Sequence, residues 1–114
     1  MKTINDIQEP LSELIENVKD VLGTSLSKII LYGSYARGEQ TEYSDIDIMV
    51  LTSLEDEEEI RKKEYELFDL VYDIELSSLL TLSIIVKNEK HFYHWVNDLP
   101  FYRNVEQEGV VLVA

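Results

Sequence analysis

Residues 31–50 read Leu-Tyr-Gly-Ser-Tyr-Ala-Arg-Gly-Glu-Gln-Thr-Glu-Tyr-Ser-Asp-Ile-Asp-Ile-Met-Val, and this stretch decides the fold. The run Lys28–Tyr32, which overlaps its start, is short, apolar and partly β-branched, so it predicts a buried strand that stops at Gly33. A short helix is expected after Gly33 and Ser34. The segment 45–51 alternates carboxylates with apolar residues, which predicts a strand with Asp45 and Asp47 on one face.

Four helices and two strands are expected outside this stretch. Apolar residues spaced by three and four predict an amphipathic helix over 10–22, with Pro10 at its first position and Gly23 as its C-cap. The residues 53–56 are typical of a helix start. Its buried stripe is expected to hold Ile60, Leu67, Val71 and Ile74, with Phe68 and Tyr72 alongside. A strand over 81–87, short helices over 90–96 and 101–107 and a strand over 109–113 complete the chain.

This order predicts an α/β (α+β) fold, in which helices pack on a small mixed sheet. The length of 114 residues fits one domain covering 1–114. There is no cysteine, which excludes disulfides, thiolate metal sites and a cysteine nucleophile. No apolar run reaches the ~20 residues of a membrane span, and no signal core opens the chain, so we expect a soluble, cytoplasmic protein without membrane contact.

The net charge is strongly negative. Ten Lys and Arg stand against 23 Asp and Glu, which gives −13 at pH 7. Such a chain is repelled by nucleic-acid phosphates, so direct nucleic-acid binding is not expected. The acidic run 55–59 predicts a solvated helix start, and a docking face for a basic partner is the alternative.

Three features between the two strands point to phosphate and metal chemistry. Gly33 permits close approach of a phosphate to the backbone, and Ser34 adds a hydroxyl donor. Arg37 can pair with a phosphate or with a carboxylate. Asp45 and Asp47 are hard oxygen ligands of the kind that Mg²⁺ takes together with phosphate oxygens. Taken singly, each has a structural alternative: a turn, a cap or a salt bridge.

The pattern Gly-Ser-x-Ala-Arg-Gly-x(5)-Ser-Asp-Ile-Asp from Gly33 to Asp47 resembles the minimal nucleotidyltransferases of the DNA polymerase beta superfamily. The resemblance implies a polymerase beta palm-like fold in which Gly33 and Ser34 hold the β- and γ-phosphates of ATP. It also implies that Asp45 and Asp47 hold two Mg²⁺ ions and carry catalysis. Arg37 and Ser44, inside the same motif, are assigned to nucleotide binding.

Many members of this superfamily pair with a HEPN-family protein as toxin and antitoxin, and some transfer AMP to that partner. The resemblance therefore implies an enzyme that moves AMP from ATP to a hydroxyl of a HEPN-type partner and releases pyrophosphate. Small molecules such as aminoglycosides are a lesser alternative as acceptors. A third possibility is a catalytically weak, nucleotide-binding antitoxin that neutralises its partner by binding.

One departure from the family pattern favours that last alternative. The superfamily usually carries a third carboxylate on the strand expected here over 81–86, but Thr81 and Ser83 stand at the alternating positions where an acid would be expected. Asp73 and Glu75 are nearby in sequence, and we expect them on the preceding helix as solvent-facing charges. The acceptor or a partner chain could then supply the base.

Other polar and aromatic residues receive weaker assignments. His91 and His94 are expected to belong to a partly buried aromatic helix rather than to a metal site. Tyr35 and Tyr43 flank the motif and could stack on a base or shape the pocket. We expect the isolated chain to be a monomer or weak homodimer and the physiological form to be a hetero-complex, with a terminal strand edge and an aromatic cluster as interface candidates: Phe92, Tyr93, Trp95, Phe101 and Tyr102.

Overall fold

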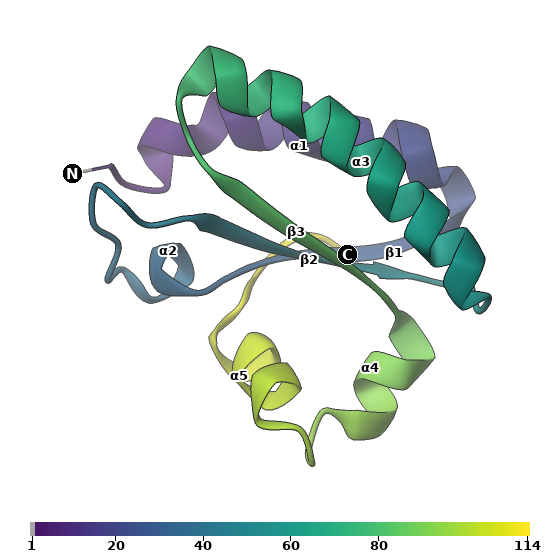
Figure 1. Cartoon of the computed structure of the whole chain (residues 1–114). Coiled ribbons are helices and arrows are strands. Elements are labelled where there is room, and N and C mark those ends of the chain that lie inside the picture. Colours follow the sequence, from purple (N-terminus) through teal and green to yellow (C-terminus); the bar gives the residue numbers. More distant parts are fainter. Residues whose placement is uncertain (1) are drawn as a thin grey trace.

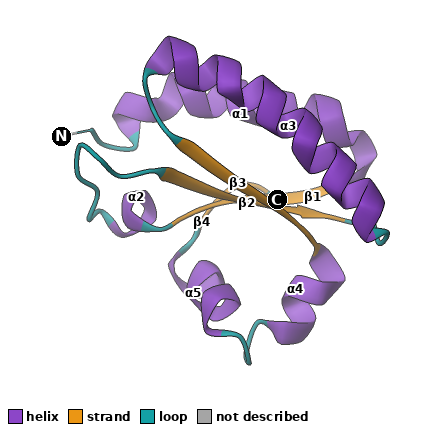
Figure 2. Ribbon diagram, viewed as in Figure 1, coloured by secondary structure: helices purple, strands orange, loops and turns teal. Residues whose placement is uncertain are grey.

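The computed structural model describes residues 2–114, and four strands and five α-helices make up this part of the chain (Figures 1 and 2). In chain order, with two short 3₁₀ turns at Asn5–Ile7 and Gly23–Ser25, the elements are α1 (Gln8–Leu22), β1 (Leu26–Tyr32), α2 (Ser34–Arg37), β2 (Ile46–Thr52), α3 (Glu57–Ser78), β3 (Leu82–Asn88), α4 (Glu89–Trp95), α5 (Pro100–Glu108) and β4 (Val110–Val113). The order of helices and strands is the one that the sequence predicts.

The strands form one mixed sheet in the order β3-β2-β1-β4. The pairs β1/β2 and β1/β4 are antiparallel, and β2/β3 is parallel, with α3 as the crossover. Helices α1 and α3 lie side by side over one face, and α4 and α5 lie under the other (Figure 1). This three-layer arrangement confirms the predicted fold class.

Alternation along β2 divides its side chains between two cores. Ile46, Ile48 and Val50 are buried against α1 and α3 in the larger core, which also takes residues of β1 and β3. Met49 and Leu51 point the other way and are buried with Phe92 of α4 and Tyr102 of α5. Since Asp47 lies two residues before Met49, the strand period directs its side chain to the α4/α5 side of the sheet.

Two helix starts differ from the sequence expectation. Helix α1 begins at Gln8, so Pro10 is its third residue rather than its first, where a missing N–H still costs no intrahelical bond. Helix α3 begins at Glu57, and Asp56 is its N-cap: the Asp56 carboxylate accepts a 3.0 Å hydrogen bond from the Glu58 amide. The acidic run 55–59 is exposed, as expected of a solvated helix start.

The apolar pattern of α3 is also only partly as expected. Leu67, Val71 and Ile74 are buried, whereas Phe68 and Tyr72 remain 42% and 58% exposed. A helix with apolar residues on both sides can bury only one of them against the sheet. The expectation that Phe68 and Tyr72 flank the buried stripe is therefore wrong.

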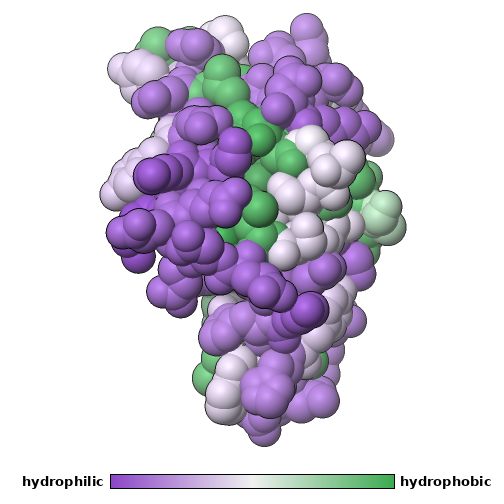
Figure 3. Space-filling model, turned by 90° about the vertical axis from the view of Figure 1, so that its right-hand side faces the viewer, coloured by the Kyte–Doolittle hydropathy of each residue, from purple (hydrophilic) through white to green (hydrophobic). Residues whose placement is uncertain are grey.

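The aromatic cluster near the C-terminus splits between core and surface. Phe92 and Tyr102 are buried under the sheet, while Tyr93, Trp95 and Phe101 stay about 40% exposed. Strand β4 is an edge strand, with Val110 and Val111 partly exposed. The end of the molecule where α1 finishes and α3 begins is mostly hydrophilic, with a hydrophobic strip running down it (Figure 3). Within residues 2–114, no helix is long and apolar enough to cross a membrane.

Candidate active site

Gly33 makes the turn between β1 and α2, and its conformation brings the backbone against a carboxylate. Its φ of 75° and ψ of −156° belong to a region that only glycine adopts readily. A Cβ built at Gly33 would overlap the Asp47 Oδ2 atom. The missing side chain thus allows the Gly33–Ser34 backbone and the Asp47 carboxylate to lie side by side.

The two aspartates are open to a cation. Asp45 is exposed directly before β2, and Asp47 is its second residue. Burial, and secondly the negative charge of Asp45, raise the pKa of Asp47, while Arg37 offsets part of this. Within residues 2–114, neither carboxylate joins a hydrogen bond or an ion pair. A divalent cation would relieve their repulsion, so this donor set fits Mg²⁺.

Strand register places two more side chains in line with Asp47. Tyr32 of β1 and Ser83 of β3 are its Cα partners on either side. Burial, and secondly the negative charge of Asp47, raise the pKa of Tyr32 to about 12. Sequence reasoning did not include Tyr32 in the site, although its place directly before Gly33 was a usable signal.

Ser83 therefore stands where a third carboxylate would face Asp47, and it is not an acid. Thr81 precedes β3 and is exposed, and its carbonyl accepts from the Ile46 amide. Asp73 and Glu75 lie on α3, as expected. Asp73 is exposed, but Glu75 is not simply a solvent-facing charge, because its Oε2 accepts from the Leu82 amide at 2.9 Å and secures the start of β3.

Arg37 lies next to Gly33 but is engaged by two carboxylates. Its Nε donates to Glu39 at 3.0 Å, and its Nη1 donates to Glu108 of α5 at 3.3 Å. These groups border a cavity of about 190 Å³ between the end of β1 and α5, lined also by Tyr32, Gly33, Phe101, Asn104 and Val105. A phosphate at Arg37 would have to exchange places with one of the two carboxylates.

The other motif residues serve the loop or the core. The Ser44 hydroxyl accepts from the Thr41 amide at 2.8 Å and so closes the turn before β2, which leaves its assigned role in nucleotide binding a prediction. Tyr35 is 2% exposed in the larger core, so the expectation that it stacks on a base is wrong. Tyr43 is 90% exposed and lies in the loop between α2 and β2.

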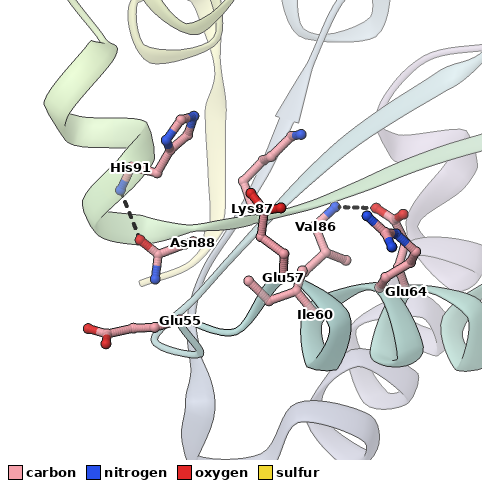
Figure 4. Close-up of a pocket in the computed structure, with 9 residues that line it drawn as sticks. Glu55, Glu57, Ile60, Glu64, Val86, Lys87, Asn88 and His91 are labelled. Carbon is pink, nitrogen blue, oxygen red and sulfur yellow. Dashed lines mark hydrogen bonds between the residues drawn. The ribbon is translucent and has the colours of Figure 1, made fainter.

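A larger cavity, of about 550 Å³, lies at the other end of β3 and holds none of the motif residues (Figure 4). Its polar contacts are structural. The Val86 amide donates to Glu64 at 2.9 Å, and the His91 amide donates to the Asn88 side chain at 2.9 Å, which caps α4. His91 and His94 are exposed, while Phe92 anchors their helix in the core, so that α4 is partly buried as expected. No cluster of three metal-ligating side chains exists within residues 2–114.

Comparison with known proteins agrees with this geometry. The family model "Nucleotidyltransferase domain" matches residues 11–112. The chain belongs to this nucleotidyltransferase family. A protein of Methanocaldococcus jannaschii named "Putative protein adenylyltransferase MJ0604" is 35% identical over 109 residues, covering 92% of this chain and 96% of its own. A second protein of that organism with the same type of name, MJ0126, is 34% identical over 97 residues, covering 80% and 85%.

Solved structures share the fold of this nucleotidyltransferase domain. A structure of the toxin–antitoxin pair MntA-HpeT aligns with a TM-score of 0.57 at 19% identity, over 90% of this chain and 72% of that one. A toxin–antitoxin structure with AMP-PNP aligns with a TM-score of 0.55 at 20% identity, over 89% and 71%. The family resemblance, the fold and the enzyme class inferred from the Gly33–Asp47 motif are thereby confirmed.

Proposed function

We propose that this nucleotidyltransferase binds ATP with Mg²⁺ and transfers AMP to a hydroxyl of a partner protein, most specifically a HEPN-type toxin. The observation that carries the proposal is the contact between the Gly33 backbone and the Asp47 carboxylate, with Asp45 beside them. A phosphate chain lying on the turn would meet the carboxylates at the same point. A cytoplasmic location, where ATP and Mg²⁺ are abundant, accords with this function.

Asp45 and Asp47 would hold the metal, and phosphate oxygens would complete its coordination. Bound Mg²⁺ would supply charge neutralisation on the phosphates and Lewis-acid activation. The protein's own part is to hold the exposed Asp45 and the partly buried Asp47 at a fixed place at the start of β2, so that little reorganisation is needed when the substrate binds. Gly33 keeps that place free of a side chain, and Ser34 offers a hydroxyl to a phosphate oxygen.

The acceptor hydroxyl would attack the α-phosphorus of ATP, forming the new P–O bond as the bond to pyrophosphate breaks. The acceptor proton must leave, and Ser83 is not a carboxylate that could receive it. A positioned base contributes ~10²–10⁴-fold, so the chain alone is expected to be slow, with a group of the partner supplying the base. The adenylyltransferase names of the relatives support AMP as the transferred group, and the MntA-HpeT alignment supports a toxin partner.

The second candidate function is neutralisation by binding alone, and Ser83 is the observation that favours it. Co-expression separates the two functions. The Asp45→Asn/Asp47→Asn double variant should still associate with the toxin but fail to protect the cell if AMP transfer is the function. Rescue by the double variant would assign the protein to the binding class.

A direct test uses labelled ATP, Mg²⁺ and the co-purified partner. We expect the partner to gain one AMP, seen as a mass increase in the intact protein, and we expect no gain with the double variant. As a matched control, Glu57→Gln and Glu58→Gln remove two negative charges at the start of α3 and should leave labelling unchanged. Labelling that survives the loss of both aspartates would show that the site is elsewhere.

A further inference from the structure

One face of helix α5 borders the smaller cavity, of about 190 Å³, opposite the turn that precedes α2. The residues that α5 contributes are spaced by three, one and three positions, which places them on a single face of the helix. They are Phe101, Asn104, Val105 and Glu108. The end of β1 forms the opposite wall with Tyr32 and Gly33. The cavity thus lies between the C-terminal helix and the motif.

This cavity adjoins the candidate active site. Tyr32, on its wall, is the Cα partner of Asp47 in the β1/β2 pair, and such partners in antiparallel strands are ~4.5–5.5 Å apart. Gly33 also lines the cavity, and its backbone lies against the Asp47 carboxylate. A nucleotide whose phosphates lie at Gly33 and Asp47 would therefore reach the cavity within about the length of its sugar.

The size and the walls of the cavity suit a flat, neutral ring system. Its volume is below the ~300 Å³ of pockets that hold a whole drug-sized ligand, so it fits one part of a nucleotide. Phe101 is 43% exposed and packs edge to face on Tyr32, with ring centroids 5.6 Å apart. Among residues 2–114, the charged groups that line the cavity are Arg37 and Glu108, which pair with each other at 3.3 Å. This lining favours a neutral base over a phosphate.

Asn104 supplies the cavity with an uncommitted amide. The residue is exposed, and within residues 2–114 its side chain takes part in no hydrogen bond. An asparagine side chain carries one carbonyl acceptor and one amino group with two donors. Adenine presents a matching pair on one edge, the N6 amino group as donor and N7 as acceptor, whereas guanine presents two acceptors there, N7 and O6.

We propose that this cavity is the subsite for the nucleotide base, and that Asn104 and Phe101 make the protein select adenine. The inference rests on the proposed function, because phosphates held at Gly33 and Asp47 bring the base to the cavity. The Phe101 ring stacks on the base, as aromatic side chains do with any nucleobase. The Asn104 carbonyl accepts from the adenine N6 amino group, and its amide donates to N7. Guanine would leave that carbonyl without a donor.

Calorimetric titration with ATP, GTP and inorganic tripolyphosphate, each with Mg²⁺, separates the base from the phosphates. Asn104→Ala should weaken ATP binding about tenfold, bring ATP and GTP to similar affinities and leave tripolyphosphate binding unchanged. Phe101→Leu keeps an apolar side chain beside Tyr32 and should weaken ATP and GTP alike, about tenfold. Gln107→Ala is the matched control, since Gln107 is an exposed amide on α5 outside the cavity, and it should bind like the parent.

Adenosine tests the cavity without phosphates or metal. Saturation-transfer NMR in the absence of Mg²⁺ should detect adenosine on the parent and on the Asp45→Asn/Asp47→Asn double variant, and a much weaker signal on Asn104→Ala. The double variant should meanwhile lose the Mg²⁺-dependent binding of ATP and tripolyphosphate.

The base subsite and the proposed function can fail separately. An Asn104→Ala variant that still prefers ATP to GTP as the parent does, or that loses tripolyphosphate affinity as much as ATP affinity, would overturn the base subsite alone. A parent chain that binds adenosine through Asn104 but binds neither ATP nor tripolyphosphate with Mg²⁺ would overturn AMP transfer and leave the adenine preference of the cavity standing.

Discussion

Replacing Gly33 by alanine tests the central contact of the site. The backbone angles of Gly33 lie in a region that costs other residues ~1–3 kcal/mol, and the new Cβ would overlap the Asp47 carboxylate. Asp47 or the turn must move in response. We expect a loss of about 3 kcal/mol in the free energy of unfolding and the loss of Mg²⁺-dependent ATP binding.

Gly38 provides the matched control. It also has a positive φ, 72°, but with ψ of 22° it is in the left-handed helical region, and a Cβ there meets nothing within 4 Å. Gly38→Ala should cost about 1 kcal/mol, since only the backbone preference is at stake. The difference between the two variants therefore reports the collision with Asp47 together with the more restricted backbone region of Gly33.

Urea denaturation measures the stabilities, and calorimetric titration with ATP, with and without Mg²⁺, measures binding. We expect Gly33→Ala to bind at least about tenfold more weakly, a difference of ~1.4 kcal/mol or more, and Gly38→Ala to bind like the parent. If both variants lose equal stability, or if Gly33→Ala binds MgATP normally, then the Gly33–Asp47 contact does not form the nucleotide site.

Three further predictions concern single side chains. Ser83→Asp puts a carboxylate beside Asp47 and should raise the AMP-transfer rate about tenfold or more. Thr81→Asp lies outside the strand register with Asp47 and should leave the rate unchanged. Equal rates for the two variants would show that the pairing of Ser83 with Asp47 is not the cause. Arg37→Gln should weaken ATP binding. It should change the melting temperature little, because both ion pairs of Arg37 are exposed. An unchanged affinity for ATP would exclude Arg37 from the nucleotide site. The backbone amide of Thr3, and to a smaller extent its hydroxyl, donate hydrogen bonds to the Asp6 carboxylate and lower its pKa below the usual 3.8. Asp6→Ala should therefore be less stable than the parent at pH 7. That difference should vanish as the pH falls below 3.8 through the lowered pKa, and a pH-independent difference would show that the carboxylate charge is not its cause.

Local features of the sequence were sufficient to predict the order of helices and strands and to identify the nucleotidyltransferase family. Alternation of apolar residues marked β2, and three-and-four spacing marked α1, because both periods follow from backbone geometry alone. The motif from Gly33 to Asp47 was readable because its parts lie within one turn and one strand start. These are short-range properties, so they need no knowledge of what packs against what.

The exposure of Phe68 and Tyr72 and the neighbours of Asp47 were decided only by the tertiary structure. Periodicity placed Leu67, Val71 and Ile74 on the buried side of α3, but it did not show that Phe68 and Tyr72 lie outside the core. Tyr35, placed near a nucleotide base on sequence grounds, belongs to the larger core because α2 packs against β1 and β2. The placement of Tyr32 and Ser83 on either side of Asp47 comes from strand register, which long-range pairing sets and which no local period records.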